Sequence, residues 1–262
     1  MRNRLFWGIV LIILGLLFLF GYQMNYPVWD LMWPFMIIVL GAWILLIPFL
    51  FRGIESVDEE LSIPLEGIQQ ATIKIEHGAG TIQLQSAALP HSLLKGSFRG
   101  GVKSKISNAQ GKCHVKLQSS FEFLKFMPGV GKEQPLLWNL TINPNIPLKL
   151  KMETGASSNT LDFRGTQLQE IKLETGASTT ELYLSEKSAF AGVHIESGAS
   201  TIRIHVPKNV AAKIKISGLI GKTIDTKRFP NINDLYISPD YNESRNQAEI
   251  EIESGVGSIE IE

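Results

Sequence analysis

The chain has 262 residues, of which 44% are hydrophobic and 19% charged, and its 25 basic side chains balance 25 acidic ones. A balanced charge gives no electrostatic reason to bind nucleic acid, which requires a concentrated basic face. A single cysteine, Cys113, excludes an internal disulfide. The length suffices for a membrane segment together with one domain of about 200 residues.

Two uncharged apolar runs occupy the N-terminal part of the chain, at about 5–22 and 31–51. A helix of the first run would rise roughly 27 Å, which is close to the thickness of a bilayer's hydrocarbon core. The connector between the runs is short and contains Pro27. Residues 1–52 are therefore predicted to form a transmembrane helical hairpin. A cleaved signal peptide is the alternative for the first run, but no small-residue cleavage site follows it.

Three arginines set the predicted orientation of this hairpin. Arg2, Arg4 and Arg52 flank its outer ends, whereas the connector carries only Asp30. The positive-inside rule then places both termini in the cytoplasm, and the following domain with them. We expect a multi-pass membrane protein, with a linker at 53–65 and a domain at 66–262.

An internal repeat dominates that domain. Each copy reads apolar-x-apolar-Glu, then a small-residue turn, then a second alternating strand. The copies are IKIEHGAGTIQLQ at 73–85, LKMETGASSNTLDF at 150–163, IKLETGASTTELYL at 171–184, VHIESGASTIRIHV at 193–206 and IEIESGVGSIEIE at 250–262, with a degenerate copy at 214–225. Glu153, Glu174 and Glu196 are 21 and 22 residues apart. A period this short indicates repeats that stack on one another.

Within each copy the hydrophobic pattern alternates with a period of two, as strands do, and no window has a helical period. The predicted fold is therefore all-β, a β-helix or solenoid-like stack of repeats of about 21 residues. A β-sandwich is the alternative, because strand–turn–strand units also form hairpins.

The turn motif pairs a glutamate with a glycine in every regular copy. The glycines would supply either a positive φ or a backbone position that a Cβ would obstruct. Stacked glutamates would form a column that nearby lysines neutralise, and the chain lacks the aspartate-rich nonapeptides of calcium-binding solenoids. These structural turn residues are Glu76, Gly78, Glu153, Gly155, Glu174, Gly176, Glu196, Gly198, Glu253 and Gly255.

Less regular insertions interrupt the repeats at about 86–147 and 226–246. The first is predicted to form a hairpin or cap over one end of the stack. The alternative is a surface for docking a partner, because apolar residues gather there. That surface would consist of Phe121, Phe123, Phe126, Met127 and Trp138.

Motifs for catalysis or cofactor binding do not emerge from the sequence. The segment 218–223 ends in Gly-Lys-Thr but lacks the first glycine of a phosphate-binding loop. The five histidines have no metal-ligand spacing, and no nucleophile elbow is present. We expect no catalytic residue, no metal and no cofactor. A carbohydrate-active β-helix enzyme is a remote alternative.

Two parts of the chain carry a family resemblance. Residues 6–51 contain WGIVLIILGLLFL and WPFMIIVLGAWIL, and the repeats contain ETGAS, ESGAS and ESGVG. With these the chain resembles the LiaF-like membrane proteins of bacteria, in which a small transmembrane module precedes a toast-rack β-domain. It departs from them in having two predicted spans where they typically have four.

The resemblance implies a non-catalytic regulator or scaffold of the cell-envelope stress response. Its partners would be the lipid bilayer and a membrane sensor kinase of a two-component system, contacted through protein–protein interactions. An extracytoplasmic structural or adhesin-like β-repeat module is the alternative function.

Overall fold

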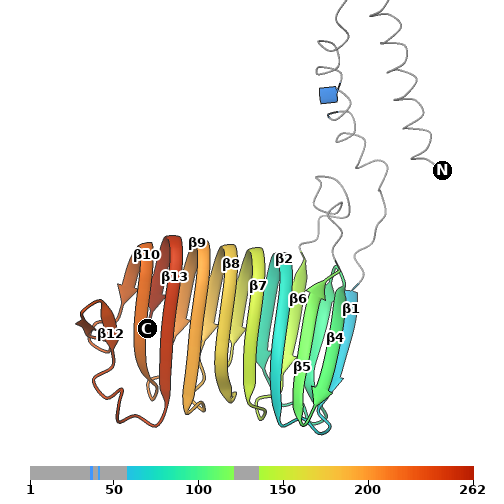
Figure 1. The fold of residues 1–262 in the computed structure, drawn as a ribbon, viewed down its shortest axis with the longest axis horizontal. Coiled ribbons are helices and arrows are strands. Elements are labelled where there is room, and N and C mark those ends of the chain that lie inside the picture. The colour runs from blue at the N-terminus through green and yellow to red at the C-terminus, as the bar shows by residue number, and fades with distance from the viewer. Residues whose placement is uncertain (1–35, 38–40, 42–57, 121–135) are drawn as a thin grey trace, which may run out of the picture. The chain divides into compact units, whose positions relative to one another are not determined.

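The computed structural model describes residues 36–37, 41, 58–120 and 136–262. The chain divides into two compact units, and the β domain, which spans 56–121 and 134–262, is the second of them. Its strands join in one sheet of the order β1-β3-β6-β2-β7-β8-β9-β13-β10-β12-β11, with β4 and β5 branching from β2 (Figure 1). The strands are β1 (Asp58–Pro64), β2 (Gln70–Ser86), β3 (Ser92–Arg99), β4 (Val102–Ala109), β5 (Lys112–Ser119), β6 (Leu137–Ile142), β7 (Leu148–Asp162), β8 (Leu168–Tyr183), β9 (Phe190–His205), β10 (Ala211–Ile224), β11 (Asn231–Ile232), β12 (Leu235–Ile237) and β13 (Gln247–Ile261).

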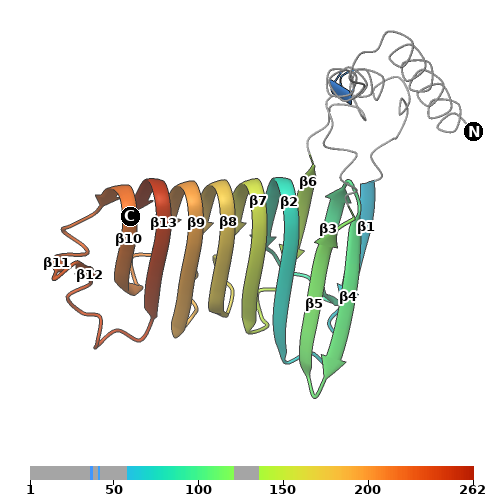
Figure 2. The same ribbon diagram turned by 45° about the horizontal axis from the view of Figure 1, so that its top comes forward.

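Each sequence repeat forms one long strand that folds over on itself. Figures 1 and 2 show β2, β7, β8, β9, β13 and β10 turning over at one end, so that their halves lie in two facing layers. In β8 the residues Ile171 and Leu173 are buried before the bend, and Thr180 and Leu182 after it. The side-chain alternation therefore changes phase at the corner, and both halves point their apolar side chains inward. We call the halves before the corner, with β4 and β5, layer A. The halves after it, with β1, β3 and β6, are layer B.

The corners are held by close contact between backbones. A Cβ on Gly176 would lie 2.7 Å from the carbonyl oxygen of Gly155, and one on Gly198 would lie 2.7 Å from that of Gly176. Gly155 and Gly255 meet the same obstruction at 2.5 and 2.6 Å, and none of these four glycines has a positive φ. Glycine is needed here because the corners of adjacent repeats approach more closely than a side chain permits.

At the N-terminal end of the stack the strands no longer fold over from one layer to the other, and the two layers form a sandwich of separate strands. The first half of β2 pairs with β5, which pairs with β4. The second half of β2 pairs with β6, and β3 and β1 follow. The predicted insertion at 86–147 thus contains regular strands, while its segment 121–135 lies outside the described residues. The predicted linker at 53–65 contains β1.

At the other end, spatial order departs from chain order. The last strand, β13, pairs in parallel with both β9 and β10, so it lies between them. The degenerate repeat, which forms β10, is therefore the last folded-over strand of the stack. The second predicted insertion holds β11 and β12, and β12 pairs with the first half of β10.

The core fills the space between the layers with aliphatic side chains and a few aromatic ones. Trp138 is completely buried and packs edge-on against Phe98, with ring centroids 5.0 Å apart. The prediction that Trp138 belongs to a partner surface is therefore wrong. Its inward position on β6 places it in the core, where burying an aromatic side chain contributes about 1.5–3 kcal/mol.

His77 is a buried titratable side chain beside this tryptophan. It exposes 2% of its surface, and its ring lies 4.7 Å from that of Trp138 in an edge-on arrangement. Neither ring nitrogen has a hydrogen-bond partner among the described residues. Burial lowers the pKa of His77 from 6.5 to about 4, because the imidazolium loses its hydration there.

The predicted fold class requires a correction. In the part of the chain that the structure describes, no helix is long and apolar enough to cross a membrane. The predicted spans at about 5–22 and 31–51 fall outside the described residues except for 36–37 and 41. Residues 58–120 and 136–262 form an all-β fold, and the described residues do not contain the predicted transmembrane hairpin. The repeats of this fold stack as a solenoid-like rack that ends in a sandwich.

Replacing Gly176 by alanine should lower the free energy of unfolding by about 1–3 kcal/mol, because the new methyl group would overlap a backbone oxygen that cannot move aside. Urea unfolding of the purified full chain measures this. Gly192→Ala is the matched control, since a Cβ there would meet its nearest atoms at 3.8 and 3.9 Å. Equal effects of the two substitutions would contradict the role of the corner.

The stability of the domain should fall as the pH decreases from about 6.5 to 4. In this window the unfolded chain protonates His77 while the native state does not, which costs up to about 3 kcal/mol. His77→Phe should weaken this pH dependence, as read from urea midpoints at pH 7 and 5.5. His114→Phe, at an exposed position, should leave this pH dependence as it is in the wild type. If the urea midpoint changed equally between pH 7 and 5.5 in the wild type and in His77→Phe, the assignment of the effect to His77 would be refuted.

Candidate functional site

The glutamates of the predicted turn motif form a continuous column on the outer side of layer A. Glu153 pairs in register with Glu76 on one side and with Glu174 on the other. Glu196 then pairs with both Glu174 and Glu253. Five carboxylates therefore lie on successive strands, at a spacing of about 4.8 Å that makes like charges repel.

Cations in the next column offset this repulsion. Lys74 Nζ lies 2.7 Å from Glu76 and 2.9 Å from Glu153, and Lys116 Nζ lies 2.8 Å from Glu76. Hydrogen bonds from Lys116 and Lys74 hold the pKa of Glu76 below its usual value, and Lys74 does the same for Glu153. Each exposed pair contributes only about 0–1 kcal/mol. The result is a face of alternating, mutually neutralised charges.

The column changes character toward β9. Lys172 pairs with Glu170, at 3.7 Å, and not with Glu174. At the equivalent position of β9 stands His194, whose Nε2 lies 2.8 Å from Glu196. The remaining predicted site residues, Arg2, Arg4, Arg52, Phe121, Phe123, Phe126 and Met127, lie outside the described residues.

A groove of about 1070 Å³ opens on layer A where β9 crosses it. In the outward-facing row of the sheet, Gly192 pairs with Glu170 of β8 and with Glu249 of β13. Because glycine has no side chain, the row has a notch at this position. We call this hollow the Gly192 groove; its lining includes Lys149, Glu170, Phe190, His194, Glu249 and Glu251.

The walls of the Gly192 groove are charged but balanced. Lys149 Nζ donates to Glu170 at 3.0 Å, Lys213 to Glu249 at 2.9 Å and Lys215 to Glu251 at 2.7 Å. These lysines hold the pKa of Glu170 and Glu251 below the usual value, so both carboxylates are ionised at neutral pH.

An aromatic side chain stands at the edge of the same groove. Phe190 begins β9 and leaves 48% of its surface exposed. A half-exposed phenyl ring beside paired ions gives the groove one apolar contact surface among hydrogen-bonding groups, which is typical of binding sites.

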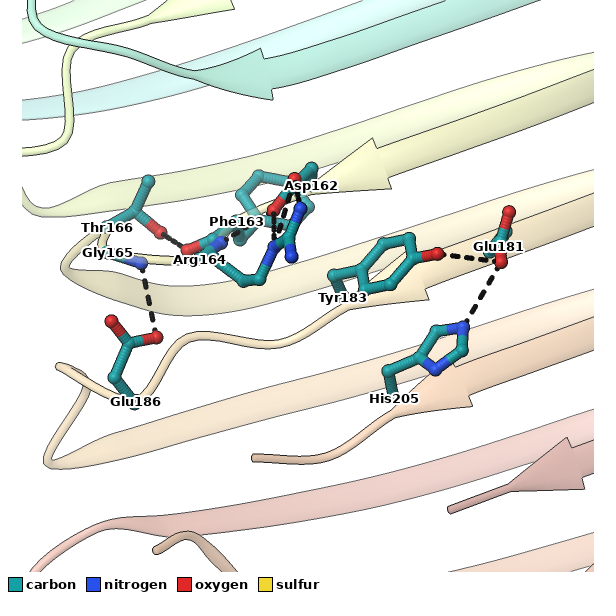
Figure 3. Close-up of polar contacts among 9 residues, drawn as sticks. All are labelled: Asp162, Phe163, Arg164, Gly165, Thr166, Glu181, Tyr183, Glu186 and His205. Atoms are coloured by element: carbon teal, nitrogen blue, oxygen red, sulfur yellow. Dashed lines mark hydrogen bonds and ion pairs between the residues drawn. The ribbon is translucent and has the colours of Figure 1, made fainter. Parts of the chain in front are cut away.

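Layer B carries a second polar cluster, shown in Figure 3. The rings of Tyr183 and His205 stack with centroids 4.1 Å apart and planes 5° from parallel. The guanidinium of Arg164 lies 4.9 Å from the centre of the Tyr183 ring. Arg164 also donates to both carboxylate oxygens of Asp162.

Glu181 joins the members of this stack. The Tyr183 hydroxyl donates to Glu181 at 2.9 Å, and His205 Nε2 lies 3.2 Å from the same oxygen (Figure 3). The hydrogen bond from Tyr183, followed by that from His205, lowers the pKa of Glu181. The other ring nitrogen of His205 lies 2.6 Å from Glu262. The polar groups of the cluster thus bind one another, and Arg164, Tyr183 and His205 also line a small pocket of about 310 Å³.

Sequence reasoning overlooked this cluster, although the repeat contained the signal. Asp162, Tyr183 and His205 are separated by the repeat period and pair in register on β7, β8 and β9. Lining up the copies would have shown that they stack.

Groups suited to metal binding are not gathered in the described residues. Within 58–120 and 136–262 no three His, Cys, Asp or Glu side chains lie close enough together to hold a metal ion. Cys113 is buried, and burial raises the pKa of its thiol, which keeps it protonated.

Comparison with known families identifies the repeat region. A sequence model described as the N-terminal domain of toast_rack, DUF2154, matches residues 52–205, more than half of the chain. Comparison with curated proteins gave no match.

One solved structure has a similar fold. A candidate cell adhesion protein from Clostridium sporogenes superposes with a TM-score of 0.70 at 21% identity, covering 79% of this chain and 98% of its own. At that identity the likeness is one of fold. A candidate adhesin from Bacteroides fragilis covers 80% of this chain and 100% of its own at 10% identity, but its TM-score of 0.29 is too low to support an argument.

Proposed function

Because the chain belongs to the toast-rack family, we propose that its β domain is a non-catalytic, adhesin-like binding module that acts outside the cytoplasm. The observation that carries this proposal is the pre-formed groove on a flat, columnar face. Stacked parallel strands keep such a face rigid, and a rigid face loses little conformational entropy when it binds a partner.

Two further observations support a binding role. The polar side chains that would suit acid–base chemistry, such as Glu181 and His205, are engaged in stacking and hydrogen bonds between neighbouring repeats. The fold is also similar to that of a protein from Clostridium sporogenes described as a candidate for cell adhesion. Two competing predictions remain: regulation of a sensor kinase, which the LiaF resemblance implies, and a cytoplasmic domain, which Arg2, Arg4 and Arg52 predict.

The side of the membrane is tested by cysteine labelling. Lys208 lies in an exposed turn after β9, so Lys208→Cys should react with a membrane-impermeant maleimide added to intact cells. The native Cys113 is an internal control, because it is buried and should react only after denaturation. Labelling of position 208 only in lysed cells would contradict an extracytoplasmic domain.

Deleting the gene separates adhesion from regulation. Cells without the protein should attach several-fold less to immobilised cell-surface polysaccharide than wild-type cells do. Transcription of envelope-stress genes under a wall-active antibiotic should be unchanged. The reverse pattern, unchanged attachment with altered transcription, would support the regulatory role and overturn the proposal.

A further inference from the structure

We propose that the Gly192 groove binds a neutral sugar ring. This inference rests on the proposed adhesin-like function and adds the chemical class of its ligand. It is carried by the width of the notch, the exposed Phe190 ring and the way in which the wall charges are paired.

The notch has a width that suits a single sugar ring. Glu170 and Glu249 stand on strands two positions apart, with Gly192 between them. Strands are separated by about 4.8 Å, so the backbones that carry these two side chains lie roughly 9.6 Å apart, and the free space between the side chains is narrower by their own thickness. A pyranose ring can enter this space edge-on between the two carboxylates, whereas any longer side chain at position 192 would fill it.

The aromatic ring and the charged side chains of the groove match the apolar and the polar surfaces of a sugar. One side of a pyranose ring presents mainly C–H groups, which pack on an aromatic ring, and Phe190 exposes 48% of its surface for such a contact. The hydroxyls around the ring both donate and accept hydrogen bonds. Carboxylates can accept from them and lysines can donate, and hydrogen bonds to ionised groups are the stronger kind.

The charge pairing favours a neutral ligand over an ion. Glu170, Glu249 and Glu251 each have a lysine within 3.0 Å. An anionic ligand would meet three carboxylates, and a cationic one would compete with lysines already in place. A neutral polyol uses the remaining lone pairs and N–H groups without displacing an ion pair.

The groove can be filled without disturbing the fold. A Cβ on Gly192 would meet its nearest atoms, from Phe190 and Gln169, at 3.8 and 3.9 Å, which are ordinary contacts. Gly192→Gln should therefore fold like the wild type and block the notch. Phe190→Ala removes the aromatic surface. Thr72→Gln is the matched control, because Thr72 lies in the same outward row on β2 and does not itself line the groove, although its row neighbour Lys149 does.

The test is isothermal titration calorimetry on the purified full chain. The neutral probes are chitotetraose, cellotetraose and mannotetraose, and the anionic probe is a heparin octasaccharide. We expect the wild type and Thr72→Gln to bind at least one neutral probe. In Gly192→Gln and Phe190→Ala the Kd should rise by at least about tenfold. Thermal unfolding of each variant verifies that it is folded.

Three results would overturn the inference: no neutral probe binds at millimolar concentration, the heparin probe binds best, or Gly192→Gln binds as the wild type does. The proposed function is judged separately by cell attachment. Cells that carry Gly192→Gln and still attach at the wild-type level would overturn the sugar site alone, whereas equal attachment with and without the whole protein would overturn the adhesin-like function.

Discussion

The close approach of backbones at the glycine corners is the constraint on which this structure depends. Where Gly176 lies against the carbonyl oxygen of Gly155, a strand can fold over without leaving the sheet, and its pairing continues on both sides of the bend. Each repeat therefore contributes to two layers with one strand. The core is enclosed between the halves of the same strands, so neither layer can form without the other.

Exact stacking has a second consequence, because every outward position becomes a column. Columns of like charge would repel, and the lysines in the neighbouring row offset part of that cost on β2, β7 and β8. Where a residue of another kind enters a column, the face acquires a local feature. Tyr183 and His205 make a stack on layer B, and Gly192 makes the notch on layer A. In such a fold, candidate binding sites therefore lie where a residue interrupts a regular column.

Much of the architecture could be predicted from the sequence, because the repeat is local and its period is explicit. The alternation of Ile171 and Leu173, the glutamates and the corner glycines all come from short-range patterns. What failed depends on non-local pairing. Tertiary contacts determine three such features: the insertion of β13 between β9 and β10, the inward position of Trp138, and the presence of β1 within the predicted linker. The Gly192 groove was missed because it is an absent side chain, which has meaning only beside its neighbours in the stack.

Hydrogen–deuterium exchange of the full chain tests most directly whether the strands continue through their corners. If they do, the amides at 175–179 and 197–201 should exchange as slowly as those of the flanking strand residues, such as 171–173. If the corners are ordinary turns, these amides will exchange as fast as those of the exposed turn at 207–209, and the rigid columnar faces proposed for binding would lose their basis.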